Sequence, residues 1–371
     1  MLDFYNNTSL STLIEPLMHQ SFWHNKDVLI TGHTGFKGSW LTLLLHSFGA
    51  KVTGYAINPI SKPNFFDDLK LGKYLQKDFR ENICNLKKLK KTIQKTKPSV
   101  IFHLVGQSSV LQSYADPLDT VNANVNGTVN LLEATRSCKS IKSIVLITSD
   151  KVYLNLEEKK KIKEDDKLGG YDLYSSSKAA CDILAESYVK SFYKDAKCNV
   201  GIARSGNCIG GGDWTKDRIV KDCVEAFIFN KKLVLRSPKA TRPWQHVLEP
   251  LFGYLKLAEK LFINKRFAGA WNFGPNLKQN LTVQELAIEG KKILSSKSKI
   301  QILKSPFYES NNLSIDSTKS RTHLNWKLAL NAKQSIRMTF EWYDCFYNNR
   351  KKIIEFTFNQ IKNYQKKLKL I

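Results

Sequence analysis

Long apolar runs are missing from this 371-residue sequence. A helix needs roughly 18 or more consecutive apolar residues to cross a bilayer, so we expect no membrane span and no membrane partner. The opening residues, MLDFYNNTSL, also lack the basic segment and the apolar core that are typical of a secretory signal peptide. We therefore expect a cytoplasmic protein.

Metal-binding and disulfide patterns are missing as well. The seven cysteines are an odd number and form no C-x-x-C pair, and the seven histidines form no H-x-x-x-H pair. Disulfide frameworks use an even number of cysteines, and structural zinc sites use closely paired Cys or His ligands. We expect reduced thiols that serve packing, and no metal.

Acidic residues are scarce: 33 Asp and Glu stand against 58 Lys and Arg, giving a net charge of +25. Clustered lysines attract phosphates, so this charge could indicate a surface for nucleic acid or membrane. The basic residues are, however, spread along the chain in short runs such as 158–163 and 349–352. We favour a lysine-rich solvated surface and no nucleic-acid partner. The alternative is a basic nucleotide- or nucleic-acid-binding protein.

Short apolar runs alternate with longer helix-like segments up to residue 207. The apolar runs predict strands at 27–32, 51–57, 99–106, 143–150 and 199–207, and the segments between them predict helices at 39–50, 86–98, 117–137 and 175–194. Strands that are apolar throughout favour a parallel sheet covered on both faces. Right-handed crossovers then give an α/β, doubly wound (Rossmann) fold. Weaker alternation after residue 207 indicates a smaller C-terminal α/β substrate-binding lobe, in line with a length above the usual 100–200 residues (roughly) of one domain.

A glycine-rich loop joins the first predicted strand to the first helix. Gly32, Gly35 and Gly38 follow the spacing G-x-x-G-x-x-G rather than the G-x-G-x-x-G of the common dinucleotide fingerprint. Glycines at this turn let the backbone approach a pyrophosphate at the helix N-terminus. A simple helix-start turn is the alternative, but the strand before the loop and the helix after it favour a cofactor loop.

Two further segments carry side chains suited to acid and base chemistry. Tyr174 and Lys178 are four residues apart, which places them on one face at the start of a helix. An ammonium group beside a phenol favours the phenolate, which can take a proton from a sugar hydroxyl while hydride leaves the carbon. Ser149, Asp150 and Lys151 lie at the carboxyl end of the strand predicted over 143–150. We therefore expect them, with Tyr174 and Lys178, at one edge of the sheet. A polar turn is the alternative for the second group.

These motifs resemble the extended short-chain dehydrogenase/reductases that act on nucleotide sugars (the NAD-dependent epimerase/dehydratase family), and within them the CDP-glucose 4,6-dehydratase subgroup. The resemblance covers residues 29 to about 275 through the segments GHTGFKGSWL, GYAINP, TSDK, GGYDLYSSSK, GNCIGGGDW, RPWQHVLEPLFGYL and WNFGP. It implies an NAD-binding domain over 20–206 and about 242–275, a nucleotide-sugar-binding lobe over about 207–241 and 276–371, and a homodimer or homotetramer.

The resemblance also implies a reaction with bound NAD that is not consumed. Tyr174, beside Lys178, deprotonates the 4-hydroxyl of CDP-glucose as hydride passes from C4 to NAD. Asp150 then protonates the departing C6 hydroxyl, Lys151 is the candidate base at C5, and hydride returns to C6. The product, CDP-4-dehydro-6-deoxy-glucose, would feed deoxysugar synthesis for surface polysaccharide such as lipopolysaccharide O-antigen. A 4,6-dehydratase or an epimerase for another nucleotide sugar remains the alternative.

Residue by residue, the same resemblance names the groups around both ligands. The implied cofactor-binding residues are Gly32, Thr34, Gly35, Phe36, Lys37, Gly38, Asn58, Asn82, Ile83, Leu104 and Gly106, together with Tyr174 and Lys178. The implied substrate-binding residues are Gln107, Ser149, Asn207, Arg218, Arg242 and His246, with Asn272 as a further candidate. The two arginines suit a diphosphate because a guanidinium fork matches phosphate oxygens, and surface ion pairs are their alternative. Asn58 leaves no acid for the adenosine ribose, so NAD over NADP rests on the resemblance.

Overall fold

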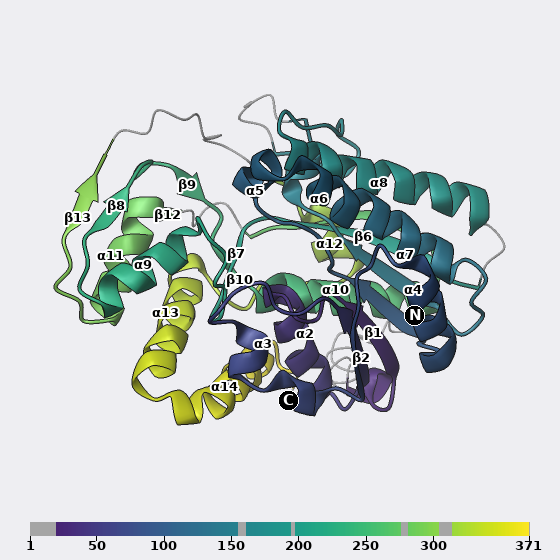
Figure 1. The fold of residues 1–371 in the computed structure, drawn as a ribbon, viewed down its shortest axis with the longest axis horizontal. Coiled ribbons are helices and arrows are strands. Elements are labelled where there is room, and N and C mark those ends of the chain that lie inside the picture. Colours follow the sequence, from purple (N-terminus) through teal and green to yellow (C-terminus); the bar gives the residue numbers. More distant parts are fainter. Residues whose placement is uncertain (1–19, 155–160, 194–196, 276–280, 304–313, 371) are drawn as a thin grey trace, which may run out of the picture.

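A single parallel sheet organises the larger part of the protein. The computed structural model describes residues 20–154, 161–193, 197–275, 281–303 and 314–370 (Figure 1). Seven strands pair in the order β11-β6-β5-β4-β1-β2-β3, and every pairing is parallel. Their bounds are β1 Asp27–Thr31, β2 Lys51–Ala56, β3 Lys77–Arg80, β4 Val100–His103, β5 Ser143–Ile147, β6 Asn199–Ser205 and β11 Gly269–Phe273. The strand order reverses between β1 and β4, so the predicted doubly wound fold is confirmed.

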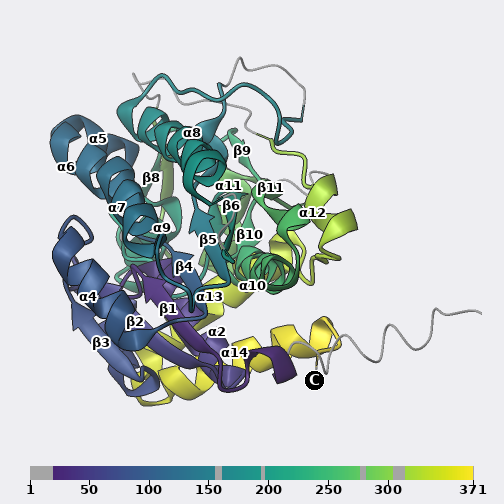
Figure 2. The same cartoon turned by 90° about the vertical axis from the view of Figure 1, so that its right-hand side faces the viewer.

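Helices cover both faces of this sheet (Figure 2). One face carries α2 (Phe36–Ser47) and α10 (Leu248–Ile263), and the other carries α4 (Leu86–Thr96), α7 (Gly127–Thr135) and α8 (Leu173–Phe192). Val28 and Ile30 of β1 enter the core on the α2 side, whereas Leu29 enters the core on the α4 side. The strands are apolar at successive positions because both of their faces are buried. Among the described residues, no helix has the length and apolar character that a membrane crossing requires.

The structure differs from the predicted pattern in three ways. β3 has the sequence KDFR, whose exposed Lys77 and Asp78 hide it from a search for apolar runs, and it lies at an edge of the sheet. The helix expected over 117–137 is built from α6 (Pro117–Val121), a π-helical turn at Asn122–Asn126, and α7. Two short helices, α3 (Phe65–Asp68) and α5 (Val110–Ala115), lie in connections where no helix was predicted.

The second part of the fold lies beside the sheet, on the left in Figure 1. It contains α9 (Ile219–Ile228), α11 (Val283–Ile293), α13 (Ala332–Asn348), and the parallel pair β8 (Leu233–Leu235) and β13 (Ile300–Ile302). Shorter pairs join β7 (Cys208–Ile209) to β10 (Gln245–His246) and β9 (Thr241–Arg242) to β12 (Leu281–Thr282). The chain then returns to the sheet through α12 (Thr318–His323) and closes with α14 (Ile353–Lys367), which packs against α2.

One apolar core runs through both parts. Trp40 of α2 donates its indole N–H to the carbonyl of Gly211 at 2.9 Å. The ring of Trp342, from α13, packs so closely on Gly211 that a Cβ atom there would lie 2.0 Å from it. Only glycine fits between the two tryptophans, and this contact locks the sheet to the smaller part.

A buried carboxyl fastens the C-terminal helix to the sheet. Glu249, in the first turn of α10, accepts hydrogen bonds from the backbone N–H groups of Ala329 and Leu330, at 3.0 and 2.7 Å, and from the Tyr364 hydroxyl at 2.7 Å. Burial raises the pKa of Glu249 to about 7, although these hydrogen bonds and Lys367 oppose the rise. The folded protein therefore holds a proton here that the unfolded chain releases near pH 4.5.

Stability is expected to fall as the pH rises from 5 to 8, because Glu249 must ionise while buried. Its contribution is fully present below the unfolded pKa and is lost as the pH passes through 7. Glu249→Gln keeps a neutral group, so we expect it to gain on the order of 2–3 kcal/mol relative to the wild type over that interval. Urea unfolding of both proteins at pH 5 and pH 8 measures the difference. Glu341→Gln on α13 is the control, and an equal pH response of both variants would contradict the prediction.

Candidate active site

The five predicted catalytic residues meet at the carboxyl edge of the sheet. Ser149, Asp150 and Lys151 leave β5 in a tight turn, in which the Ser149 hydroxyl accepts a hydrogen bond from the Lys151 N–H at 3.2 Å. Tyr174 and Lys178 lie in the first turns of α8. The Lys151 ammonium lies 5.8 Å from the centre of the Tyr174 ring. The structure thus brings together two segments that the sequence separates by more than twenty residues.

Local capping explains why α8 begins beside this turn. The carboxylate of Asp172 accepts hydrogen bonds from the Ser175 N–H at 2.9 Å and from the Ser175 hydroxyl at 2.7 Å. An aspartate at this position satisfies a free N–H group of the first turn and complements the positive end of the helix dipole. Tyr174 is consequently held in a regular first turn, with less than a tenth of its surface exposed.

Asp150 is electrostatically suited to carry a proton. It is almost fully buried, and burial raises the pKa of its carboxyl, while Lys151 and a 3.0 Å hydrogen bond from the Ser149 hydroxyl oppose the rise. Gly206, just after β6, passes so close that a Cβ atom there would lie 3.2 Å from Asp150 Oδ2. A carboxyl with a raised pKa is the kind of group that acts as a general acid near neutral pH.

Two residues around Lys178 were missed by the sequence analysis. A Cβ atom on Gly106 would lie 2.4 Å from Lys178 Nζ and 2.7 Å from Asn124 Oδ1, so the ammonium and the amide face the same point. Asn124, in the π-helical turn, donates to Ser177 Oγ at 2.8 Å. Behind them His103 is kept neutral, because burial and the charge of Lys178 lower its pKa to about 3. No spacing in the sequence singles these residues out.

The glycine loop fits the diphosphate of a dinucleotide. Gly32 has φ +81°, and a Cβ atom there would lie 2.8 Å from the backbone that follows β4, while one on Gly38 would lie 2.2 Å from the Gly32 carbonyl oxygen. At Gly35, at the start of α2, a Cβ atom would meet only the Gly32 carbonyl oxygen, at 3.5 Å, and no side chain caps this helix. Free N–H groups at a helix start favour a phosphate. The Thr34 hydroxyl donates to the Ile57 carbonyl at 3.1 Å and ties the loop to the end of β2.

Gly32→Ala is expected to destabilise the protein by about 2–4 kcal/mol. Two costs add up: alanine is strained at a positive φ, and its Cβ atom would clash with the backbone that follows β4. Gly269 provides a matched control: it also has a positive φ, +100°, but a Cβ atom there would meet nothing within 4 Å. Gly269→Ala should therefore cost only about 1–2 kcal/mol. Urea unfolding measures both, and equal losses would show that the contact with the β4 backbone is unimportant.

The other predicted cofactor residues lie along the ends of β2, β3 and β4. Asn58 is exposed just after β2. Asn82 uses its side-chain oxygen to accept a hydrogen bond from the Cys84 N–H at 2.8 Å, and Ile83 is buried. Leu104 and Gly106 are half-buried in the loop after β4, and Phe36 is half-buried at the start of α2. Lys37, next to Phe36 and also half-buried, donates a hydrogen bond from its ammonium to Ser205 Oγ at 2.8 Å.

The predicted substrate residues do not all lie together. Gln107 donates to Thr120 Oγ1 at 2.9 Å, and Arg218 donates to the Ser108 carbonyl at 3.2 Å, so the smaller part of the fold touches the loop after β4. Asn207 follows β6 and is half-buried, as is Arg242 on β9.

His246 and Asn272 stand apart from this group because both are fully buried. The His246 ring packs edge-on against Trp40 at 5.5 Å between centres. Asn272 accepts a hydrogen bond from the Tyr153 hydroxyl at 2.7 Å and donates to the Ile162 carbonyl at 3.1 Å. Both ends of its amide make hydrogen bonds within the protein, and its contact with a substrate stays a prediction.

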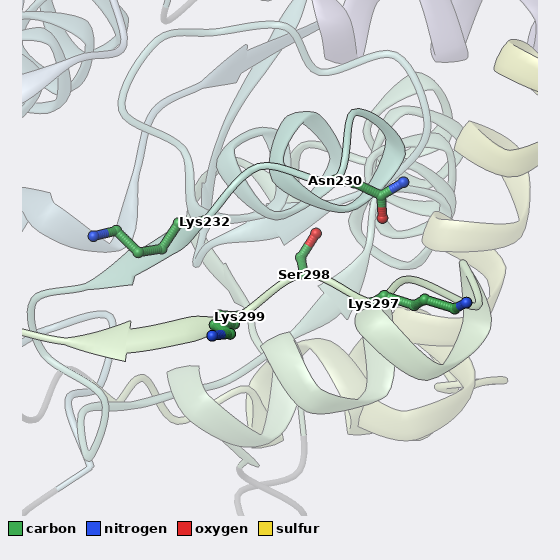
Figure 3. Close-up of a pocket in the computed structure, with 5 residues that line it drawn as sticks. All are labelled: Asn230, Lys232, Lys297, Ser298 and Lys299. Atoms are coloured by element: carbon green, nitrogen blue, oxygen red, sulfur yellow. The ribbon is translucent and has the colours of Figure 1, made fainter.

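A separate hollow of about 410 Å³ lies on the outer side of the smaller part, at the turns that lead into β8 and β13. It is lined by Asn230, Lys232, Lys297, Ser298 and Lys299. Figure 3 shows that the lysine side chains diverge rather than converge on one point. None of the predicted site residues lines it.

Comparison with known proteins agrees with this geometry. A family model described as GDP-mannose 4,6 dehydratase matches residues 29–339. The chain belongs to this family. Among its relatives, the CDP-glucose 4,6-dehydratase of Salmonella typhimurium is 36% identical, over 91% of this chain and 96% of that protein. The resemblance inferred from the motifs is confirmed, and it places the chain among enzymes of the 4,6-dehydratase type.

Solved structures of other proteins share the fold. An epimerase from Methanothermobacter thermautotrophicus superimposes with a TM-score of 0.78 at 17% identity, covering 91% of this chain and 97% of its own. A dTDP-glucose 4,6-dehydratase from Bacillus anthracis, solved in complex with NAD, has a TM-score of 0.72 at 22% identity and covers 89% of this chain and 99% of its own.

Proposed function

We propose that the protein is an NAD-dependent hydro-lyase that converts CDP-D-glucose to CDP-4-dehydro-6-deoxy-D-glucose. The observation that carries the proposal is the pair of a buried Asp150 and an adjacent Lys151, whose ammonium lies 5.8 Å from the Tyr174 ring. An epimerase needs a base for the sugar hydroxyl but no acid and base for an elimination. The choice of CDP-glucose is supported by the relative that is 36% identical. The choice of NAD is supported by the dTDP-glucose 4,6-dehydratase of the same fold that was solved in complex with NAD, and the uncapped start of α2 suits its diphosphate.

The side chains of the site divide the steps of this reaction between them. Tyr174 takes the proton of the sugar 4-hydroxyl, and Lys178 lies one helical turn farther along α8. Bound NAD would accept a hydride from C4 and return it at C6. Lys151 removes the proton at C5, which the 4-keto group acidifies, and Asp150 gives a proton to the departing C6 hydroxyl, so that water leaves. Lys151 then returns a proton, exchanged with solvent, to C5 as the hydride would arrive at C6. Ser149 and the diphosphate-binding candidates Arg218 and Arg242 orient the substrate.

The wider setting belongs to the same proposal. We assign NAD to residues 20–206 and about 242–275, and the nucleotide sugar to about 207–241 and 276–371, a division supported by the place of β11 in the main sheet. The enzyme would work in the cytoplasm as a homodimer or homotetramer. Its product would enter deoxysugar synthesis for surface polysaccharide.

Mass spectrometry of the products tests the proposal. The purified protein is incubated with CDP-glucose, UDP-glucose, dTDP-glucose or GDP-mannose, with and without added NAD, in ordinary and in deuterated water. We expect loss of one water from CDP-glucose alone, with one solvent deuteron in the product. Water loss from another donor would overturn the choice of CDP-glucose, and water loss from none would overturn dehydration itself.

A further inference from the structure

A buried guanidinium lies directly behind the catalytic groups. Arg204, near the end of β6, is 1% exposed, and its Nε forms an ion pair with the carboxylate of Asp182 on α8. Its Nη1 donates to the Tyr153 hydroxyl and to the Glu164 carbonyl oxygen, both at 2.8 Å. The guanidinium also lies 4.9 Å from the centre of the Tyr153 ring. One side chain therefore joins three segments of the chain.

Each segment leads directly to a catalytic residue. Asp182 is one helical turn beyond Lys178 on α8, and Tyr153 is two residues beyond Lys151. The segment that contains Glu164 leads into the start of α8. The Tyr153 hydroxyl, besides accepting from Arg204, donates to Asn272 Oδ1 on β11 at 2.7 Å, so its position is fixed from both sides. The distance between the Asp150–Lys151 turn and the Tyr174–Lys178 helix is thus set by contacts through Arg204.

Stability alone does not explain this arrangement. Removing two charges from water costs several kcal/mol, and apolar residues of similar volume often stabilise a core as well as a buried ion pair does. A planar fork with fixed donor directions does, however, orient its partners more narrowly than apolar packing can. Tyr153 is 2% exposed, so it acts on the reaction only through the residues it holds.

We propose that Arg204 and Tyr153 are positioning residues that hold the acid and base of the elimination step in register with the Tyr174–Lys178 pair. This inference rests on the proposed function. C4 oxidation depends on α8, whereas water loss depends on the turn after β5. Loosening the contact between them slows water loss more than oxidation, and the enzyme then accumulates reduced cofactor and oxidised sugar.

Tyr153→Phe tests this by removing one hydroxyl. The matched control is Tyr193→Phe, which also removes a buried hydroxyl at α8: Tyr193 is 1% exposed and donates to the Leu132 carbonyl at 2.7 Å, at the far end of the helix. We expect similar shifts in melting temperature for both variants. Only Tyr153→Phe should lower kcat for dehydration, by about tenfold with an unchanged KM, and raise the steady-state absorbance of reduced cofactor.

Arg204→Lys provides a second variant, because lysine keeps the charge beside Asp182 but loses the fork that reaches Tyr153. It should show the same accumulation of reduced cofactor. The inference is overturned if the wild type dehydrates its substrate and, in both Tyr153→Phe and Tyr193→Phe, the rate of oxidation falls by the same factor as the rate of water loss. A wild type that turns over none of the four nucleotide sugars would instead overturn the proposed function, and with it the two steps that this inference separates.

Discussion

The Lys151→Ala variant is expected still to transfer hydride from CDP-glucose to bound NAD, but to release almost no dehydrated product. The rate of water loss should fall by about three orders of magnitude. Nζ of Lys151 lies 5.8 Å from the centre of the Tyr174 ring, and alanine removes this amine, the proposed base at C5, without removing the groups that act at C4. The oxidised sugar should then remain on the enzyme. Absorbance of the reduced cofactor follows the first step, and mass spectrometry of the nucleotide sugar follows the second.

Lys163→Ala is the matched control for this result, because Lys163 is exposed on the segment that leads to α8. It removes the same charge from the protein as a whole and should leave both steps unchanged. Equal losses of oxidation and of water release in Lys151→Ala would contradict the role of Lys151 at C5, since a base for elimination does not act in the hydride step.

Tyr174→Phe is expected to stop the reaction one step earlier. Phenylalanine keeps the buried ring and its packing but removes the only atom of this side chain that can accept the proton of the sugar 4-hydroxyl. Reduction of bound NAD in a single turnover should fall by about three orders of magnitude, within the usual range for removing a general base. Rapid-mixing absorbance of enzyme with CDP-glucose measures this rate directly.

Tyr188→Phe distinguishes the chemical role from an effect on the helix. Tyr188 is half-buried farther along α8, where its ring lies 5.1 Å from that of Phe192. This variant should oxidise the sugar at the wild-type rate. If Tyr174→Phe did so as well, another group would have to accept the proton, and the proposed mechanism would be wrong at its first step.

Periodicity predicted the central part of the fold, and it failed at polar and distant elements. β1, β4 and β5 are buried on both faces, and their apolar runs mark them clearly. β3 escaped because an edge strand needs no apolar sequence on both faces. β11 pairs with β6 only after the chain has passed through the smaller part, and no local pattern shows where it returns.

The candidate site divides in the same way. The motifs TSDK and YSSSK predicted the residues that meet at the carboxyl edge of the sheet, because acid and base side chains are visible in the sequence itself. The residues that hold them were not predicted. Arg204, Tyr153 and Asn272 are far apart in the sequence and meet through the order of β6, β5 and β11 in the sheet. Asn272 was named as a substrate contact from the segment WNFGP alone, and its hydrogen bonds to Tyr153 and Ile162 could not be foreseen from that segment.

The tryptophan contact across Gly211 limits how ligands come and go. Trp40, from the sheet part, and Trp342, from the smaller part, both contact Gly211. A large rotation of one part away from the other would therefore have to break the apolar core that they share. Local openings that break few buried contacts are far more frequent than such global ones. We expect binding and release of the nucleotide sugar to depend on short loops, such as the loop after β4, whose Ser108 carbonyl accepts a hydrogen bond from Arg218. The rate of product release would then depend on the motion of this loop rather than on a movement of the two parts of the fold relative to each other.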